Sequence, residues 1–486
     1  MGEQQAKDIP FGREPVTSHS SLPDVSWFLN RVPLECGGLP TAATDLVDSD
    51  AGGGNIAADH MNHKACLLLF ALLGPTLLIG QTPSQPPTTA IDPRWQIPAS
   101  DEGLPGAGPL RRADWFRKVW AERRSAWAQR VERDQGALVF LGDSITQGWG
   151  DSMGGAFAGV KVANRGISGD TTRGVLIRLK EDVLALRPSG VVLLIGTNDL
   201  EEGADPEIIA DNLKLILAAL KAHHATMPVV LCQVFPSSAS KKRPSDKIKK
   251  VNQLYAAAVK GDSQILYLET WPLFADDQGD AKAEEFPDLL HPNKAGYAKW
   301  AAAIRPILAT LDFVEKEDDT FQPEAGFVSL FNGRDLTGWG FRTNAFDGRA
   351  ESPDKRYVAR HGRLIVTTPP EGRRIQQLWT TRQFSNNFTL KLEFRATPNA
   401  DSGVFIRQPQ LQCRDYWLAG PYKQLKSYRP QEWNEMIVTV KEGVAYCSCN
   451  GEVLEASLKV PSTGPIGLEG DRGQMEYRRI RLQELP

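Results

Sequence analysis

The chain has 486 residues, too many for one compact core, so two or more domains are expected. Hydrophobic residues make up 41% of it and charged residues 24%, as in ordinary soluble globular proteins. The formal net charge of -3 gives no electrostatic basis for binding nucleic acid or an anionic membrane surface. The six cysteines are too few for a disulfide scaffold and lack the paired spacing of a zinc site, so we expect neither a metal nor another cofactor.

The N-terminal part of the chain differs in composition from the rest. Residues 1–60 contain clusters of Gly, Ser, Pro and Asp without periodicity, which predicts a disordered extension. A basic start at Met61 then leads into an apolar run, so residues 61–81 are predicted to be a signal peptide, with a membrane anchor or a buried helix as alternatives. We expect Met61 to be the true start, the mature protein to be periplasmic or extracellular without a membrane span, and residues 82–109 to be a linker.

Apolar runs alternate with helical patterns between residues 110 and 312. An amphipathic helix is predicted from Trp115 to Val131, with tryptophans that face the core. Strands are predicted at 137–141, 191–195, 229–234 and 265–268, and helices at 208–220, 248–259 and 295–308. The alternation predicts an α/β domain with a parallel sheet and helices on both faces. Ligands of such sheets gather beyond the carboxyl ends of the strands.

Three residues of this domain are the parts of an activated-hydroxyl hydrolase. Ser144 directly follows the first predicted strand, and far downstream Asp288 lies three residues before His291. A serine hydroxyl becomes a good nucleophile only when a base takes its proton, and that base needs a third group to fix its tautomer. The spacing lets the Asp288 carboxylate reach the imidazole. The three residues therefore predict nucleophilic catalysis by serine.

Two further segments follow the same edge of the predicted sheet. Asn198 comes directly after the second predicted strand, and Gly169 lies in a polar loop that spans residues 164–172. Asp143 and Asp199 are interpreted as carboxylates that brace these loops, and residues 171–173 as the cap of the next helix. Ser144 is expected to open a helix whose N-terminal partial charge favours an oxyanion.

In this order, the segments around Ser144, Gly169, Asn198 and His291 resemble the SGNH (GDSL) hydrolase family, in its platelet-activating-factor acetylhydrolase-like branch, over about residues 135–310. The resemblance implies a flavodoxin-like three-layer fold. It also implies that Ser144 is the nucleophile, His291 the general base and then acid, and Asp288 the residue that orients it. The oxyanion hole would consist of the Ser144 and Gly169 N–H groups and the Asn198 amide. Thr146 stands where an α/β-hydrolase elbow has its second glycine, which argues against that fold.

A second folded unit is predicted at 324–486, after a linker at 313–323. Apolar and polar residues alternate strictly from Phe388 to Arg395, as in a half-buried antiparallel strand. Asn450-Gly451 predicts a two-residue hairpin turn. Several such strands predict an antiparallel β-sandwich of the jelly-roll type.

The segments at 331–339, 402–407 and 464–468 resemble the 3-keto-disaccharide hydrolase domain family, which has a concanavalin-like fold. The segment 411–428 departs from the family pattern, which favours carbohydrate binding over catalysis by this domain. Aromatic candidates for sugar contacts are Trp379, Tyr416, Trp417 and Trp433, together with Tyr422 and Tyr428. Cys447 or Cys449 could pair with Cys413 in an exported protein.

The expected function is a secreted serine esterase that removes small acyl groups, above all acetyl, from a carbohydrate. The substrate is then an acylated small molecule or polysaccharide. Two alternatives remain open. One is a lysophospholipase or platelet-activating-factor-type acetylhydrolase that acts on lipid, and the other is a glycan-binding protein. A further alternative gives the C-terminal domain glycoside-cleaving activity of its own.

Overall fold

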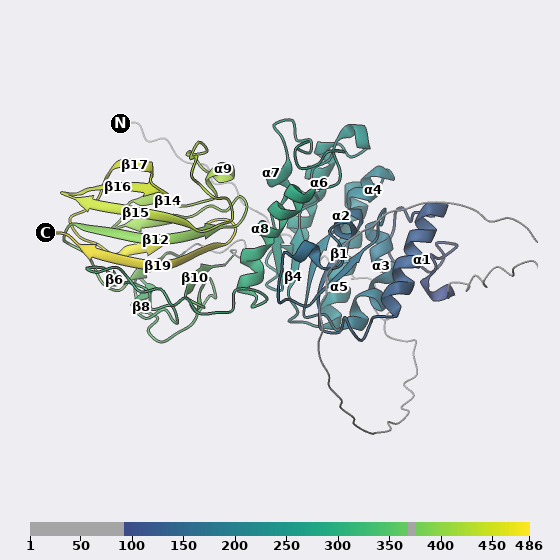
Figure 1. Ribbon diagram of the computed structural model, residues 1–486, viewed down its shortest axis with the longest axis horizontal. Helices are drawn as coiled ribbons and strands as arrows, with labels where there is room; N and C mark the ends of the chain where they lie inside the picture. The colour runs from purple at the N-terminus through teal and green to yellow at the C-terminus, as the bar shows by residue number, and fades with distance from the viewer. Residues whose placement is uncertain (1–91, 368–375) are drawn as a thin grey trace, which may run out of the picture. The chain divides into compact units, whose positions relative to one another are not determined.

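The computed structural model describes residues 92–367 and 376–486, which belong to one compact unit of the chain. The predicted disordered extension, the predicted signal peptide and the start of the predicted linker lie outside the described residues. Figure 1 shows an α/β domain followed along the chain by a domain of antiparallel strands. We call them the first domain (residues 92–312) and the second domain (residues 324–486).

The first domain is built around a parallel five-stranded sheet with the order β2-β1-β3-β4-β5 (Figure 1). Its strands are β1 (Leu138–Gly142), β2 (Val162–Gly166), β3 (Gly190–Leu194), β4 (Val229–Cys232) and β5 (Ile265–Leu268). This is the flavodoxin-like order, in which the direction of strand addition reverses between β1 and β3. The predicted fold class is confirmed, and ligands of such sheets bind at that reversal.

Helices lie on the faces of this sheet. They are α1 (Asp114–Ala128), α2 (Ser144–Gly148), α3 (Thr172–Asp182), α4 (Thr197–Glu201), α5 (Pro206–His223), α6 (Ser245–Val259), α7 (Trp271–Phe274) and α8 (Lys294–Thr310), with 3-10 turns at Pro93–Trp95, Met153–Gly155, Leu184–Leu186 and Ala239–Lys241. Phe140 of β1 and Val192 of β3 pack with Trp300 of α8 on one face. Helices α1, α3, α5 and α6 contact one another in another layer. Within the described residues, the helices are too short or too polar to cross a membrane.

Strand β2 was predicted as part of a polar loop, because Asn164 and Arg165 interrupt its apolar pattern. Both side chains are buried and hydrogen-bonded. Arg165 donates to Asp134 at 2.8 Å, and the Asn164 amide donates to the Thr146 carbonyl at 2.7 Å. Buried polar groups are tolerated in a sheet once they have such partners. These contacts between distant segments cannot be read from local sequence.

The segment 92–113, most of which was predicted to be linker, packs against the first domain. Ile97 and Leu110 are buried with Phe116 and Trp120 of α1. The Asn212 side chain on α5 accepts from the Ala107 N–H at 3.0 Å. Arms of this kind are ordered by burial and hydrogen bonding, and this one positions the start of α1.

The second domain contains two antiparallel sheets, with the orders β17-β16-β15-β12-β19-β10-β9 (β6 also pairs with β19) and β14-β13-β18-β11-β7-β8 (Figure 1). Its elements are β6 (Val328–Ser329), β7 (Trp339–Phe341), β8 (Asn344–Ala345), β9 (Tyr357–Arg360), β10 (Arg363–Val366), β11 (Leu378–Thr380), β12 (Phe388–Ala396), β13 (Gly403–Ile406), β14 (Gln410–Gln412), α9 (Tyr416–Ala419), β15 (Asn434–Lys441), β16 (Val444–Cys449), β17 (Glu452–Lys459), β18 (Ile466–Leu468) and β19 (Met475–Glu484). The predicted β-sandwich is therefore confirmed.

Local signals of this domain match the structure. Along β12, Phe388, Leu390 and Leu392 are fully buried and alternate with partly exposed residues. The Asn450-Gly451 turn joins β16 to β17, and both residues have positive φ (48° and 85°), as a type I′ hairpin requires. Cys413, Cys447 and Cys449 are buried free thiols in the core of this domain, so the structure contains no disulfide between them.

Candidate active site

Ser144 is the first residue of α2, immediately beyond the carboxyl end of β1. Asp143 caps this helix: its Oδ1 accepts from the Ile145 N–H at 2.9 Å. A side chain at Gly142 would lie 2.3 Å from the Leu194 carbonyl oxygen, so the chain can approach β3 only with glycine there. Because α2 has only five residues, individual N–H groups act on an anion at this end, rather than a summed helix dipole.

Ser144, His291 and Asp288 form a continuous chain of hydrogen bonds. The Ser144 Oγ lies 2.9 Å from the His291 Nε2, and the His291 Nδ1 lies 2.7 Å from the Asp288 Oδ2. The backbone N–H of His291 donates to the Asp288 Oδ1 at 2.7 Å, so both carboxylate oxygens are engaged. The imidazole is thereby held in one orientation. Ser144 comes from a position 147 residues earlier in the chain.

The charge of Asp288 suits this arrangement. Partial burial acts against ionisation, but hydrogen bonds from the backbone and ring of His291 outweigh it and lower the pKa of the carboxyl group below its ordinary value of 3.8. A carboxylate that stays ionised near neutral pH keeps the proton of the neutral imidazole on Nδ1. The Nε2 atom is then free to accept a proton from Ser144.

Hydrogen bonds join the loop that contains Gly169 to α2 and to the segment that carries Asn198. The Ser168 N–H donates to the Gln147 Oε1 on α2 at 2.7 Å, and the Asn198 Nδ2 donates to the Asp170 carbonyl at 2.9 Å. Gly169 has φ +84°, a conformation that glycine adopts readily. Among the described hydrogen bonds its N–H has no acceptor. The three predicted oxyanion donors thus lie on neighbouring segments at the strand-order reversal.

Asp143 and Asp199 both make the loop contacts predicted for them, Asp143 through its cap on α2. Asp199 on α4 is fully buried and accepts from the Thr172 N–H at 3.0 Å and from the Thr172 hydroxyl at 2.5 Å. The hydroxyl of Thr171 accepts from the Gly174 N–H at 3.2 Å and caps α3. These bonds hold the Gly169 loop against the segment that carries Asn198.

The carboxyl group of Asp143 makes the stability of the folded chain depend on pH. Burial raises the pKa of its carboxyl group from 3.8 to about 7, although the Ile145 N–H opposes the shift. The folded chain therefore holds this proton more tightly, and stability falls as pH rises from about 4 to 7, by up to about 1.4 kcal/mol per pH unit. Asp143→Asn keeps the cap and removes this titration, so we expect its stability to rise relative to wild type between pH 5 and 7.5 in urea unfolding. Parallel pH profiles of the two proteins would contradict this.

Arg243 is a site residue that sequence reasoning missed. Its Nη2 donates to the Asn198 Oδ1 at 2.9 Å and to Glu201 at 2.8 Å, and its Nε donates to the Thr197 carbonyl at 3.1 Å. The Asn198 amide group therefore has its oxygen and one N–H fixed, which leaves its second N–H for a ligand. Arg243 lies in a loop without strand or helix signals, so no local pattern identifies it.

Because Arg243 orients the Asn198 amide, its loss is expected to affect turnover more than substrate binding. A charge-assisted hydrogen bond is worth about 1.5–3 kcal/mol, so Arg243→Ala should lower kcat by roughly 10- to 100-fold with little change in KM. Arg243→Lys should restore part of kcat. Steady-state kinetics of the three proteins test this, and a rise in KM at constant kcat would contradict the positioning role.

The six aromatic residues predicted to contact sugars differ in exposure: Tyr428 is buried and Tyr422 is partly exposed. Tyr416 is fully buried and bonded to the Gln412 carbonyl, so its ring presents no face to solvent. Trp433 is partly exposed, with the guanidinium groups of Arg395 and Arg478 at 4.7 and 4.0 Å from its ring centroid. Trp417 is 46% exposed. Trp379 is largely buried at the base of a pocket.

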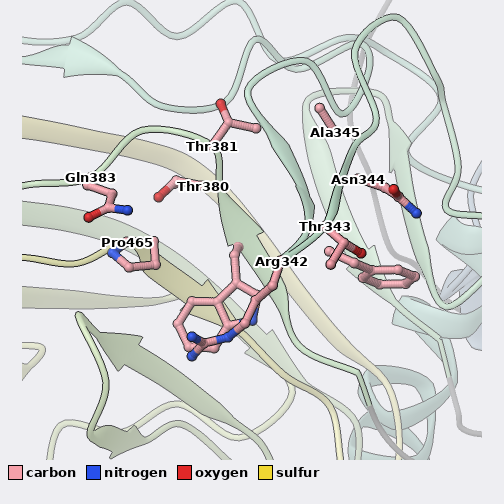
Figure 2. Close-up of a pocket in the computed structure, with 10 residues that line it drawn as sticks. Arg342, Thr343, Asn344, Ala345, Thr380, Thr381, Gln383 and Pro465 are labelled. Carbon is pink, nitrogen blue, oxygen red and sulfur yellow. The ribbon is translucent and has the colours of Figure 1, made fainter.

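Figure 2 shows this pocket, which has a volume of about 340 Å³ and lies where β7, β8 and β11 meet. Its lining combines two aromatic residues and a guanidinium with hydroxyl and amide groups: Phe341, Arg342, Thr343, Asn344, Ala345, Trp379, Thr380, Thr381, Gln383 and Pro465. The Arg342 guanidinium lies 4.4 Å from the Trp379 ring centroid. The polar groups on both sides of Arg342 can donate and accept hydrogen bonds. The pocket therefore offers hydrogen-bonding partners to a polar ligand.

Residues 92–367 and 376–486 contain no candidate metal site, because their His, Cys, Asp and Glu side chains form no group of three or more that could hold an ion. His361, in the second domain, instead contacts Asp318 at 3.1 Å and Asp312 at 3.3 Å.

Residues 140–299 match the family model of the GDSL-like Lipase/Acylhydrolase family. The first domain belongs to this family. Residues 326–483 match the 3-keto-alpha-glucoside-1,2-lyase-like domain, and the second domain belongs to that family. Both predicted resemblances are confirmed. The chain is thus an enzyme of the carboxylic ester hydrolase class, with a GDSL-type acylhydrolase domain.

Relatives of the GDSL domain lie in the predicted branch. The alpha1 subunit of platelet-activating factor acetylhydrolase IB from Pongo abelii is 29% identical over 181 residues, which are 36% of this chain and 76% of the relative. The alpha2 subunit from Bos taurus is 26% identical over 199 residues, 40% of this chain and 84% of the relative. The solved structure of a GDSL-like lipase from Bacteroides thetaiotaomicron is 26% identical, covers 40% of this chain and 97% of its own, and gives a TM-score of 0.35.

Proposed function

We propose that the GDSL domain hydrolyses esters of small acyl groups, above all acetyl, through a covalent intermediate on Ser144. The observation that carries the proposal is the chain of contacts from the Ser144 Oγ to the His291 Nε2 (2.9 Å) and from the His291 Nδ1 to Asp288 (2.7 Å). Nucleophile, base and orienting carboxylate lie within hydrogen-bonding distance of one another. These distances are those of an activated serine.

In the first half of the reaction, the Ser144 Oγ attacks the ester carbonyl carbon while the His291 Nε2 takes the hydroxyl proton. The tetrahedral intermediate carries its negative charge on the former carbonyl oxygen, which accepts from the Ser144 N–H, the Gly169 N–H and the Asn198 amide. When it collapses, His291 returns the proton to the leaving alcohol and the acyl group stays on Ser144. A water molecule, deprotonated by His291, then releases the acid by the same steps in reverse.

We propose a carbohydrate as the alcohol half of the ester. Two observations support it: the second domain belongs to a family named for a keto-glucoside, and its pocket presents hydroxyl and amide groups beside Trp379. A polysaccharide held by the second domain would raise the local concentration of ester groups near the GDSL domain. The predicted signal peptide leads us to propose an exported enzyme, which would meet such substrates outside the cytoplasm.

A lipid substrate is the second candidate, because the relatives in the same branch are platelet-activating factor acetylhydrolase subunits. A third candidate adds to esterase activity a glycoside-cleaving activity of the second domain, as its family name suggests.

One substrate comparison with the purified full chain separates these candidates. We expect acetate release from acetylated xylan to exceed release from an acetylated ether phospholipid and from long-acyl esters. Affinity electrophoresis in xylan gels measures glycan binding separately, and a 3-keto-glucoside tests for cleavage by the second domain. Preferred hydrolysis of the phospholipid would contradict the carbohydrate proposal and leave the serine mechanism intact.

A further inference from the structure

Trp115 is a large aromatic side chain that the first domain leaves open to solvent. It is 49% exposed, whereas its neighbours Phe116 and Trp120 on α1 are fully buried. Tryptophan carries a wide apolar surface, and about half of this side chain is open to contact with a ligand. Helix α1 lies before residues 140–299, the part of the chain that matches the GDSL family model, so that match assigns Trp115 no role.

The Trp115 ring lies directly against Gly169. A Cβ atom at Gly169 would lie 2.5 Å from the Cη2 atom and 3.1 Å from the Cζ3 atom of this ring, closer than van der Waals contact permits. The outer edge of the indole thus occupies the space that a side chain at residue 169 would need. Gly169 is also a proposed donor to the oxyanion. The ring consequently lies at the edge of the reaction centre.

One charged group, the Arg111 guanidinium, lies beside the ring. The Arg111 Nη1 lies 2.9 Å from the same Cβ position, and its guanidinium carbon lies 5.4 Å from the Trp115 ring centroid. Arg111 is held by Glu201 at 2.6 Å and by Glu202 at 2.7 Å. Glu201 also accepts from Arg243, which orients the Asn198 amide. Hydrogen bonds through Glu201 therefore connect Arg111, beside the ring, to Arg243 and to the Asn198 amide of the oxyanion site.

We propose that Trp115 and Arg111 form a subsite for the sugar ring that bears the acyl group. This inference rests on the proposed function. The subsite is open, as the alcohol half of the ester requires because it must leave to solvent; a small acyl group would need an enclosed pocket instead. The Arg111 guanidinium beside the indole can donate hydrogen bonds to sugar hydroxyls. The apolar neighbour of the indole, Phe116, is fully buried in the domain and offers no surface to an acyl chain.

Kinetics on two esters test the subsite. We expect Trp115→Ala to raise KM for acetylated xylo-oligosaccharides about tenfold, the loss of about 1.4 kcal/mol of binding, and to leave kcat/KM for ethyl acetate within about twofold of wild type. Trp115→Phe retains a ring and should keep most of the affinity. Tyr446→Ala, which removes another exposed aromatic ring (42% exposed) from the outside of the second domain, is the matched control and should change neither ester.

The outcomes separate the subsite from the proposed function. Equal losses on both esters would overturn the subsite and give Trp115 a structural role on the Gly169 loop. Unchanged kinetics of Trp115→Ala on the oligosaccharide would also overturn it, while the carbohydrate esterase stands. A wild-type enzyme that hydrolyses ethyl acetate but no acetylated sugar would overturn both the subsite and the carbohydrate substrate.

Discussion

Ser144→Ala is expected to abolish ester hydrolysis. The substitution removes the atom that forms the covalent intermediate, and the remaining residues can stabilise only a direct attack by water. Loss of a triad member lowers kcat by roughly 10⁴- to 10⁶-fold in serine hydrolases, with substrate binding little affected. We expect a decrease of this size in the release of p-nitrophenol from p-nitrophenyl acetate, measured by absorbance.

Ser152→Ala is the matched control for this variant. Ser152 lies eight residues later in the same region, is exposed, and makes no capping hydrogen bond with its side chain. It should retain wild-type kinetics and thermal stability. A Ser144→Ala protein that keeps more than about 1% of the wild-type rate would rule out Ser144 as the nucleophile, because no other step could supply the missing 10⁴-fold.

Asn198→Ala is expected to lower kcat by about 10²- to 10³-fold, the usual effect of deleting one oxyanion donor. The amide binds the carbonyl oxygen more strongly as negative charge develops on it, so the loss should fall on kcat and leave KM within a few fold. The measurement is steady-state kinetics of the variant and the wild type on one acetyl ester. Loss of the bond to the Asp170 carbonyl adds a stability cost that thermal unfolding measures separately.

Asn212→Ala is the matched control for Asn198→Ala. Asn212 is also a buried asparagine, and its amide bonds to Thr172 at 3.0 Å and to the Ala107 carbonyl at 2.8 Å. It supports the same loop without a donor at the reaction centre, so we expect lower stability with kcat close to wild type. Equal losses of kcat in the two variants would show that loop stability, and not an oxyanion contact, explains the effect.

Much of the fold follows from local pattern. Buried parallel strands appear as short apolar runs, which is why β1, β3, β4 and β5 were predicted close to their observed positions. Strand β2 was missed because its polar residues find their partners in distant segments, and no window of the sequence contains both sides of such a contact. The strict alternation in β12 and the Asn450-Gly451 turn were sufficient to indicate an antiparallel domain.

The residues of the candidate site also differ in whether local sequence identifies them. Ser144, Asp288 and His291 stand in recognisable segments, and the structure brings the three side chains together. Arg243 and Trp115 carry no such signal. Arg243 acts through the Asn198 amide from a loop. The prediction that the tryptophans of α1 face the core holds for Trp120 and Trp127 but was wrong for Trp115, which is 49% exposed. Side chains that matter only through tertiary contact require the structure.

Covalent labelling shows whether Ser144 is a nucleophile activated by His291. The wild-type chain would be treated with an organophosphonate ester, and the modified residue located by mass spectrometry of the peptides. We expect one phosphonate per chain, on Ser144, with labelling greatly slowed in His291→Ala and absent in Ser144→Ala. A label on another residue, or an enzyme that hydrolyses acetyl esters at full rate after Ser144 is modified, would contradict it.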